Sequence, residues 1–104
     1  MIKLTVLYTP PSDVTAFDEH YLAVHLPLAS KIPNLLRAET SVCVATADGS
    51  PVPYHRIAEL YFESTDALGA GMATDEGKAA GDDAQELAAR TGSTVSMVIG
   101  VLDE

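Results

Sequence analysis

Cysteine, tryptophan and basic residues are scarce in this chain, and each scarcity narrows what the protein can be. The 104 residues include one cysteine, no tryptophan, and six Lys and Arg against fifteen Asp and Glu, which gives a net charge of −9. The lone Cys43 cannot form an internal disulfide, and it excludes a metal site built from a cysteine cluster. A single free thiol is compatible with a reducing compartment, so we expect a cytoplasmic protein.

The acidic balance and the lack of long apolar runs argue against two kinds of partner. A surface of this charge repels the phosphates of nucleic acids and anionic lipid headgroups, so we expect no nucleic-acid partner and no membrane association. No stretch approaches the roughly 18 apolar residues of a membrane span. Residues 1–12 carry one lysine and a short apolar run before two prolines, so we interpret them as mature sequence rather than a signal peptide.

The length and the apolar fraction indicate one domain with a thin core. A chain of 104 residues fits the usual size of a single domain, and we assign residues 1–104 to one. Hydrophobic residues make up 47% of the chain, but many are alanines and only 6% of the residues are aromatic. Because such a core is shallow, we expect the chain to gain stability by burying more surface against a partner subunit.

Apolar periodicity and turn signals predict six elements. Ser12 or Asp13 offers a side-chain oxygen to cap the first helix. Pro27 removes a backbone hydrogen bond inside that helix, which predicts a kink or a break just after His25. The glycine-rich segment 67–81 has the weakest helical pattern, and we expect it to be the most mobile. The expected elements are a strand at 2–9, a helix from 13 to about 32, strands at 36–47 and 53–63, helical residues after a Ser64 cap and again at 82–90, and a strand at 93–102.

The order β-α-β-β-α-β indicates an α+β protein of the ferredoxin-like type, a four-stranded antiparallel sheet with the helices on one face. Alternation along residues 53–63 puts Leu60 and Phe62 under the helices. It puts His55 and Tyr61 on the opposite face. The last strand is apolar on both faces, which is unusual for a sheet with solvent on one side. We therefore predict that two copies of the chain cover the free sheet face by forming a homodimer.

His25 is the residue whose side chain is best suited to catalysis. It follows Tyr21 by four positions, so both side chains lie on nearly the same face of the first helix. An imidazole in the crevice between helix and sheet can transfer protons near neutral pH, and a phenol beside it can donate a hydrogen bond. The alternative is a structural histidine bonded to a carbonyl freed at the proline. Under the first interpretation the candidate catalytic residues are His25 and Tyr21, and the candidate ligand-binding residues are Tyr8, Phe17, Leu28 and Met72.

The remaining polar residues have simpler interpretations. His20 lies five positions before His25, about 500° around an α-helix, so we expect it on the solvated face instead. His55 is expected at a subunit interface. Asp82 and Asp83 are interpreted as a solvated helix start, where negative charge suits the helix dipole. With three scattered histidines and no cysteine cluster, we expect no metal site.

Two stretches of the chain resemble the EthD group of the dimeric α/β-barrel superfamily, and the resemblance spans nearly the whole length. The first is the string Phe17-x-x-x-Tyr21-x-x-x-His25-x-Pro27-Leu28, followed by Ile32-Pro33. The second is Ala58-Glu59-Leu60-Tyr61-Phe62, which leads into Ser64-x-x-Ala67-Leu68. The resemblance matches His25 to the characteristic histidine of the group and Tyr21 to the aromatic position one turn earlier. Asn34 stands where a glycine often follows the Ile-Pro pair.

This resemblance implies a homodimer whose two sheets pack face to face, with a cleft between sheet and helices in each subunit. Relatives in the superfamily include isomerases, aromatic polyketide cyclases, dehydratases and cofactor-free monooxygenases. It implies a protein that binds a small organic molecule and uses His25 to move a proton beside a carbonyl or a phenol, with no bound cofactor. Two alternatives stay open: a non-catalytic accessory or carrier protein of an oxygenase pathway, and cofactor-free oxygen chemistry.

Overall fold

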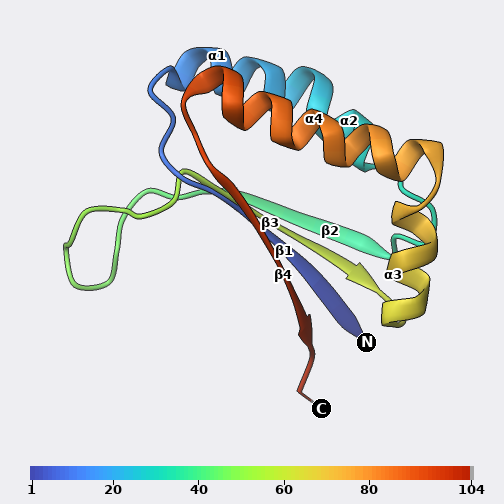
Figure 1. The fold of residues 1–104 in the computed structure, drawn as a ribbon. Helices are drawn as coiled ribbons and strands as arrows, with labels where there is room; N and C mark the ends of the chain where they lie inside the picture. The colour runs from blue at the N-terminus through green and yellow to red at the C-terminus, as the bar shows by residue number, and fades with distance from the viewer. Residues whose placement is uncertain (104) are drawn as a thin grey trace.

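The computed structural model describes residues 1–103, which form two layers, a four-stranded antiparallel sheet and a set of helices on one of its faces (Figure 1). This confirms the predicted α+β, ferredoxin-like arrangement. The elements are β1 (Ile2–Tyr8), α1 (Val14–His20), the π-helix η1 (Tyr21–His25), α2 (Leu26–Ala29), β2 (Arg37–Val42), β3 (Arg56–Phe62), α3 (Thr65–Met72), α4 (Asp75–Thr91) and β4 (Val95–Val101).

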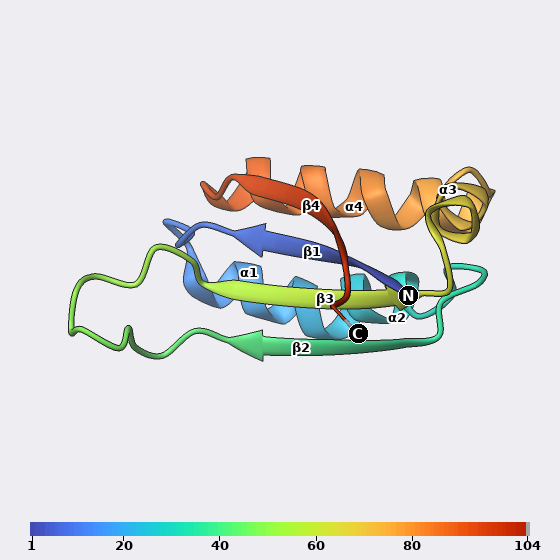
Figure 2. The same ribbon diagram turned by 90° about the horizontal axis from the view of Figure 1, so that it is seen from below.

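The strands lie in the order β2-β3-β1-β4, with the helices behind them in the view from below (Figure 2). β1 is central, and its Leu4 stands opposite Leu60 of β3 and Ile99 of β4. Because side chains alternate along a strand, every second residue of β1 from Ile2 to Tyr8 is buried under the helices. Leu60 and Phe62 are buried on the same side, as predicted.

The first helical segment continues through Pro27 instead of breaking before it. Asp13 caps α1 by accepting a hydrogen bond from a backbone N–H of the first turn. Between α1 and α2 the five residues Tyr21–His25 form a wider π-helical turn, in which the Leu26 N–H donates to the Tyr21 carbonyl oxygen. Such a turn accommodates the Pro27 ring, which crowds a carbonyl of the preceding turn in an ordinary α-helix. The helix ends at Ala29, three residues earlier than expected.

The glycine-rich region forms two packed helices rather than a mobile segment. Ser64 and Thr74 cap α3 and α4 through their side-chain oxygens, and α4 runs for 17 residues. A Cβ atom added at Gly71 would overlap the carbonyl oxygen of Pro33, and one added at Gly77 would overlap the backbone of α3. These glycines therefore allow the backbones to approach closely. Helix propensity alone treats the same glycines only as weak helix formers.

The connections account for the remaining differences from the predicted boundaries. β2 and β3 are shorter than expected, and residues 43–55 between them include the predicted turn, where Ser50 N–H donates to Asp48 Oδ1. Asn34 adopts a left-handed backbone with φ 70° and donates from Nδ2 to the Ala67 carbonyl oxygen. An asparagine tolerates this conformation better than most residues, which explains why it can stand where glycine is common.

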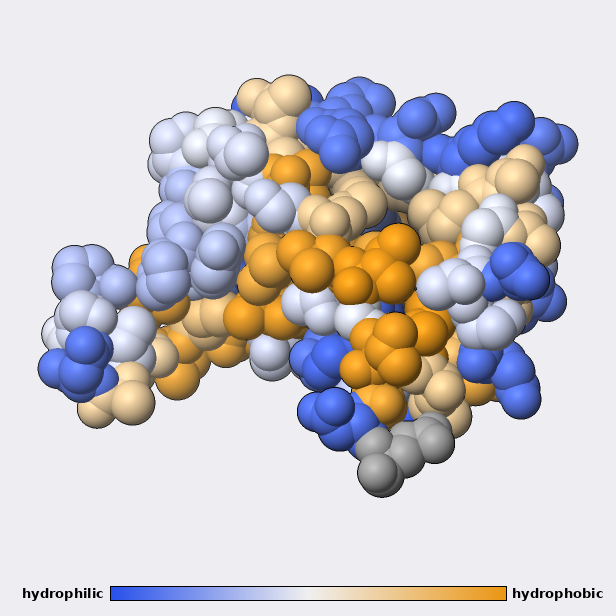
Figure 3. All heavy atoms as spheres, turned by 60° about the horizontal axis from the view of Figure 1, so that its bottom comes forward, coloured by the Kyte–Doolittle hydropathy of each residue, from blue (hydrophilic) through white to orange (hydrophobic). Residues whose placement is uncertain are grey.

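The free face of the sheet combines polar contacts at its centre with a few exposed or half-buried apolar residues. Lys3 and Glu59 form an ion pair of 2.9 Å, and Tyr61 donates a hydrogen bond to Glu39 at 2.8 Å. Figure 3 shows apolar side chains gathered across the surface where the sheet comes forward. β4 is apolar on both faces, as predicted, whereas the ion pair and the Tyr61–Glu39 hydrogen bond at the centre were not expected. Four apolar residues of β4 are exposed. Val98 lies on the free face, whereas Met97, Ile99 and Val101 stand opposite buried residues of β1 and lie on the helix side.

Candidate functional site

A cleft of about 420 Å³ lies between the helices and the sheet. Aliphatic side chains of β1, β3, α2 and α4 provide most of its lining, and the main polar groups are those of Tyr21, His25, Ser30 and Thr40. All six residues of β2 are exposed, and five of the cleft-lining residues lie in that strand or just before it, so the cleft opens beside β2. Its size and composition are typical of sites for small organic ligands.

A stack of three rings forms the helix side of the site. Phe17 and Tyr21 lie parallel with centroids 5.6 Å apart, and Tyr21 and His25 repeat the same geometry. Tyr8 of β1 meets all three rings edge-on, at centroid distances between 5.1 and 6.4 Å. Edge-on and offset contacts of this kind stabilise aromatic clusters, so the His25 ring is held in place on two sides.

His25 is hydrogen-bonded at both ring nitrogens. Its Nδ1 lies 2.9 Å from Asp83 Oδ2 of α4, and its Nε2 lies 3.4 Å from the Tyr8 hydroxyl. Burial lowers the pKa of His25, although the hydrogen bond and the charge of Asp83 act in the opposite direction. Burial also raises the pKa of Tyr8, whose phenol therefore stays protonated. The site thus holds a neutral imidazole beside a carboxylate and a phenol at neutral pH.

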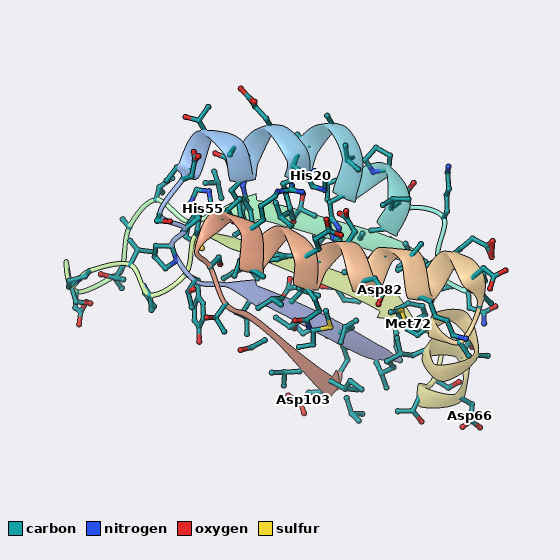
Figure 4. The ribbon with its side chains drawn as sticks, turned by 45° about the horizontal axis from the view of Figure 1, so that its top comes forward. His20, His55, Asp66, Met72, Asp82 and Asp103 are labelled. Atoms are coloured by element: carbon teal, nitrogen blue, oxygen red, sulfur yellow. The ribbon has the colours of Figure 1, made fainter. Side chains whose placement is uncertain are left out.

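His20 belongs to the same cluster, contrary to the prediction. Its Nε2 lies 2.8 Å from Asp83 Oδ1, so His20 and His25 contact one carboxylate. The prediction assumed an α-helix, but in the π-helical turn residues five apart lie on one side. His20 lies between α1 and α4 (Figure 4). Asp83 is likewise not at a solvated helix start, because α4 begins at Asp75 and places Asp83 in its middle.

The hydroxyl of Tyr21 has no hydrogen-bond partner within residues 1–103. Tyr21 is fully buried and lines the cleft, and its Oη is the buried side-chain polar atom left unpaired in this part of the chain. Burial raises the pKa of Tyr21, with the Arg56 charge acting against it, so the phenol stays a donor. A buried donor without an acceptor is costly and therefore rare in folded proteins.

His55 lies on the helix side of the sheet rather than on the free face. Its Nε2 is 2.8 Å from Asp18 Oδ1 of α1, and its ring meets Phe17 edge-on at 5.4 Å. Arg56 donates to the same oxygen from Nε and Nη2 at 3.2 Å. Burial raises the pKa of Asp18, but these hydrogen bonds outweigh it and hold the pKa below its usual value. The alternation argument fails because His55 precedes β3, where the backbone is not yet extended strand.

The structure places the four candidate ligand-binding residues in three different surroundings. Met72, at the end of α3, lines the cleft with Tyr21 and His25; Figure 4 shows it beside α4. Tyr8 and Phe17 are completely buried behind the cleft wall and line no part of it. Leu28 lies elsewhere, beside a shallow depression between α2 and the start of α4. The stripe used to group these residues assumed a regular α-helix, which the π-helical turn interrupts.

Asp83 is the site residue that the sequence reasoning missed. Thr74 is a capping residue before a turn rich in acidic side chains, which is a usual helix start. A helix that begins after Thr74 has Ala80, Ala84 and Leu87 as its buried stripe. Asp83, four residues before Leu87, then lies beside this stripe. The glycines of the segment hid this signal.

Two absences within residues 1–103 bear on the site and its setting. No three His, Cys, Asp or Glu side chains in this part of the chain lie together so that they could hold a metal ion. None of the helices formed by these residues has the length and apolar character needed to cross a membrane.

The chain was compared with protein families, curated proteins and solved structures. The model of the EthD domain matches residues 9–91. An uncharacterized 11.0 kDa protein of Rhodococcus erythropolis, from the thcB-thcC intergenic region, is 39% identical over 88 residues, which cover 85% of this chain and 84% of that protein.

Two solved structures extend the comparison to the fold. An ethyl tert-butyl ether d (EthD) family protein of Bacillus halodurans superposes with a TM-score of 0.90 at 37% identity over 99% of both chains. A dimeric ferredoxin-like protein of unknown function from Thermobifida fusca has a TM-score of 0.70 at 17% identity, covering 97% of this chain and 90% of that one. The family match and the two relatives above 30% identity agree: this chain belongs to the EthD domain family.

Proposed function

We propose that this protein binds a small, largely apolar organic molecule in the cleft and that His25 transfers a proton to or from it. The observation that carries the proposal is the position of His25, which lines an apolar cleft while its Nδ1 contacts the Asp83 carboxylate at 2.9 Å. A carboxylate behind an imidazole orients the ring and stabilises the imidazolium that forms when the other nitrogen takes a proton.

The binding half of the proposal is supported by the lining of the cleft. Arg37 is the one lining residue whose side chain is permanently charged, and its guanidinium stacks on the Tyr61 ring on the far face of the sheet. A charged ligand would lose its hydration with no opposite charge facing it, so the cleft favours uncharged molecules. The buried Tyr21 hydroxyl supplies a hydrogen-bond donor for an oxygen of the ligand.

The catalytic half follows from the state of the imidazole. His25 is neutral at pH 7 because burial lowers its pKa, and a neutral imidazole can act as a base. The step is a proton transfer: the bond from the ligand's acidic C–H or O–H to its proton breaks, the electron pair stays on the ligand, and the proton binds His25 Nε2. Returning the proton to another ligand atom completes an isomerisation and leaves the protein unchanged. No cofactor takes part in this scheme.

We further propose that the functional unit is a homodimer built on the free sheet face. The Thermobifida fusca protein with the same fold is dimeric, and the free face of this sheet carries three apolar residues that are exposed or half-buried, Leu7, Ile57 and Val98. Exposed apolar patches of this kind mark protein interfaces. Sedimentation of the wild type and of Val98→Glu tests the assembly: the wild type should sediment as a dimer and the variant as a monomer. A monomeric wild type would overturn the dimer.

The exchange of ketone protons for deuterium tests the chemistry without knowledge of the natural ligand. We choose 2-tetralone, an uncharged bicyclic ketone with acidic C–H bonds, and follow the loss of its α-proton signals by NMR in D₂O. The wild type should accelerate the exchange above the buffer rate, and His25→Gln should abolish the acceleration. Leu28→Ala is the matched control, because Leu28 is a helix residue outside the cleft. Equal exchange by wild type and His25→Gln would refute the role of His25.

A carrier role is the second candidate, and one observation favours it. Both ring nitrogens of His25 already contact protein groups, Asp83 and Tyr8, so the ring can serve as a fixed part of the cleft wall. The two functions differ in outcome. A carrier binds 2-tetralone without exchanging its protons, and His25→Gln then binds it as tightly as the wild type does.

A further inference from the structure

A single carboxylate links two histidines and an arginine in the helix layer. Asp83 Oδ2 faces His25 Nδ1 at 2.9 Å, and Asp83 Oδ1 faces His20 Nε2 at 2.8 Å. On its other side His20 Nδ1 lies 3.0 Å from Nη2 of Arg90. Exposure of the side chains rises along the series, from 10% at His25 through 20% at His20 to 49% at Arg90. The series therefore runs from the cleft to the surface.

The chemistry of arginine fixes the direction of the hydrogen bonds in this series. A guanidinium only donates, so Nδ1 of His20 must be an acceptor and carries no proton. The proton of His20 is then on Nε2, and this N–H donates a hydrogen bond to Asp83. The ionised Asp83 only accepts, so His25 donates from Nδ1. The proton-free nitrogen of His25 is thus Nε2, which the Tyr8 hydroxyl faces at 3.4 Å.

We propose that Arg90 and His20 are positioning residues for His25, acting through Asp83, and that they keep the Asp83 carboxylate a shared acceptor so that His25 presents Nε2 as its base. This rests on the role proposed above for His25. His20 divides the negative charge of Asp83 between two imidazoles. It also locks the carboxylate in the plane that suits His25, as groups behind a functional histidine commonly do.

The arrangement has a functional consequence for the base. With His20 in place, His25 faces a carboxylate that is already partly neutralised by a second N–H donor. Without His20 the whole charge of Asp83 acts on His25, and its imidazolium becomes easier to form. The other groups around His25 are Tyr8 from β1 and Tyr21 from its own turn, and those around His20 are Arg90 and, beside it, Glu86 from α4. Both phenols stay neutral, so Asp83 is the charge that matters.

Nitrogen-15 NMR of the wild-type imidazoles at neutral pH tests the inference directly, without ligand or turnover. Long-range correlations from the ring carbon-bound protons distinguish the protonated nitrogen from the bare one. We expect the proton on Nδ1 in His25 and on Nε2 in His20. A proton on Nδ1 of His20, or on Nε2 of His25, would overturn the proposal. A failure of the 2-tetralone assay with these tautomers in place would instead refute only the proposed function.

Two substitutions at one position separate positioning from structural support. His20→Phe keeps a ring but removes the donor to Asp83, whereas His20→Gln keeps both an N–H donor and an acceptor for Arg90. We expect the NMR titration midpoint of His25 to shift upward in His20→Phe and to stay at the wild-type value in His20→Gln. An unchanged midpoint in a folded His20→Phe would contradict the proposal, as would equal upward shifts in both variants. If His20→Phe does not fold, the wild-type tautomers and the titration midpoint of His25 in His20→Gln still test the positioning role of His20.

Discussion

Two buried tyrosines of this protein allow the effect of deleting a hydroxyl group to be compared in two different surroundings. Tyr8 and Tyr21 are both fully buried, and both rings belong to the aromatic cluster around His25. The Tyr8 hydroxyl faces His25 Nε2, whereas the Tyr21 hydroxyl has no partner in the described part of the chain. The substitutions Tyr8→Phe and Tyr21→Phe therefore delete a paired and an unpaired hydroxyl with almost no change in packing.

The expected magnitudes follow from the cost of burying an unpaired polar group, about 1–3 kcal/mol. Tyr21→Phe removes such a group, so the free energy of unfolding should stay constant or rise by about 1 kcal/mol. Tyr8→Phe removes a long hydrogen bond and leaves Nε2 of His25 unpaired, so the free energy of unfolding should fall by about 1 kcal/mol. The same Tyr21→Phe variant should bind 2-tetralone more weakly, because the ketone oxygen loses its donor.

Urea unfolding followed by circular dichroism measures the stability difference, and a fluorescence or calorimetric titration measures the binding. A gain in stability paired with a loss in binding is the signature of a group retained for function. If Tyr21→Phe instead lost as much stability as Tyr8→Phe, the Tyr21 hydroxyl would have to be satisfied in the free protein. The argument for a ligand donor would then fail.

Three further predictions concern packing and charge. Gly69→Ala should stabilise α3 by up to about 1 kcal/mol, because alanine is the better helix former and nothing lies near its Cβ. Gly71→Ala should destabilise the protein by about 1–3 kcal/mol, because its Cβ overlaps the Pro33 carbonyl. Equal effects of the two substitutions in urea unfolding would refute this packing. The pKa of His25 lies below its unfolded value, so the unfolded chain binds more protons below about pH 6.5 and stability should fall as the pH drops, more steeply in the wild type than in His25→Gln. Asp83→Asn should lower the pKa of His25 further, because the carboxylate is the group that raises it; an NMR titration showing a higher midpoint would contradict the assigned contact.

The fold was predictable because its signals are local and mutually consistent. Alternation over residues 2–9, the cap at Asp13 and the cap at Ser64 each specify an element without help from the rest of the chain. The proximity of His25 and Tyr21 was predictable for the same reason, since they lie four residues apart in one helical segment. Residue spacing could also place Met72 near the cleft, although it gave no indication that Leu28 lies elsewhere.

The rest of the site could not be read from the sequence because it depends on irregular geometry. The π-helical turn brings His20 and His25 to one side, and a regular helical wheel separates them. The partner Asp83 comes from a helix whose glycines suggest flexibility, although Gly77 is needed for the close packing of α3 against α4. The side of the sheet on which His55 lies was mispredicted, because strand alternation does not apply before Arg56, the first residue of β3. Functional sites commonly break local rules in this way.

A titration of the protein with 2-tetralone, followed by NMR at the methionine and leucine methyl groups and at the histidine rings, tests most directly whether the cleft is the binding site. The cleft account predicts saturable shifts at the Met72 methyl group and the His25 ring, with the Leu28 methyl signals unchanged. Saturable shifts at Leu28 with Met72 and His25 unmoved, or no saturable shift at any of the three, would contradict it.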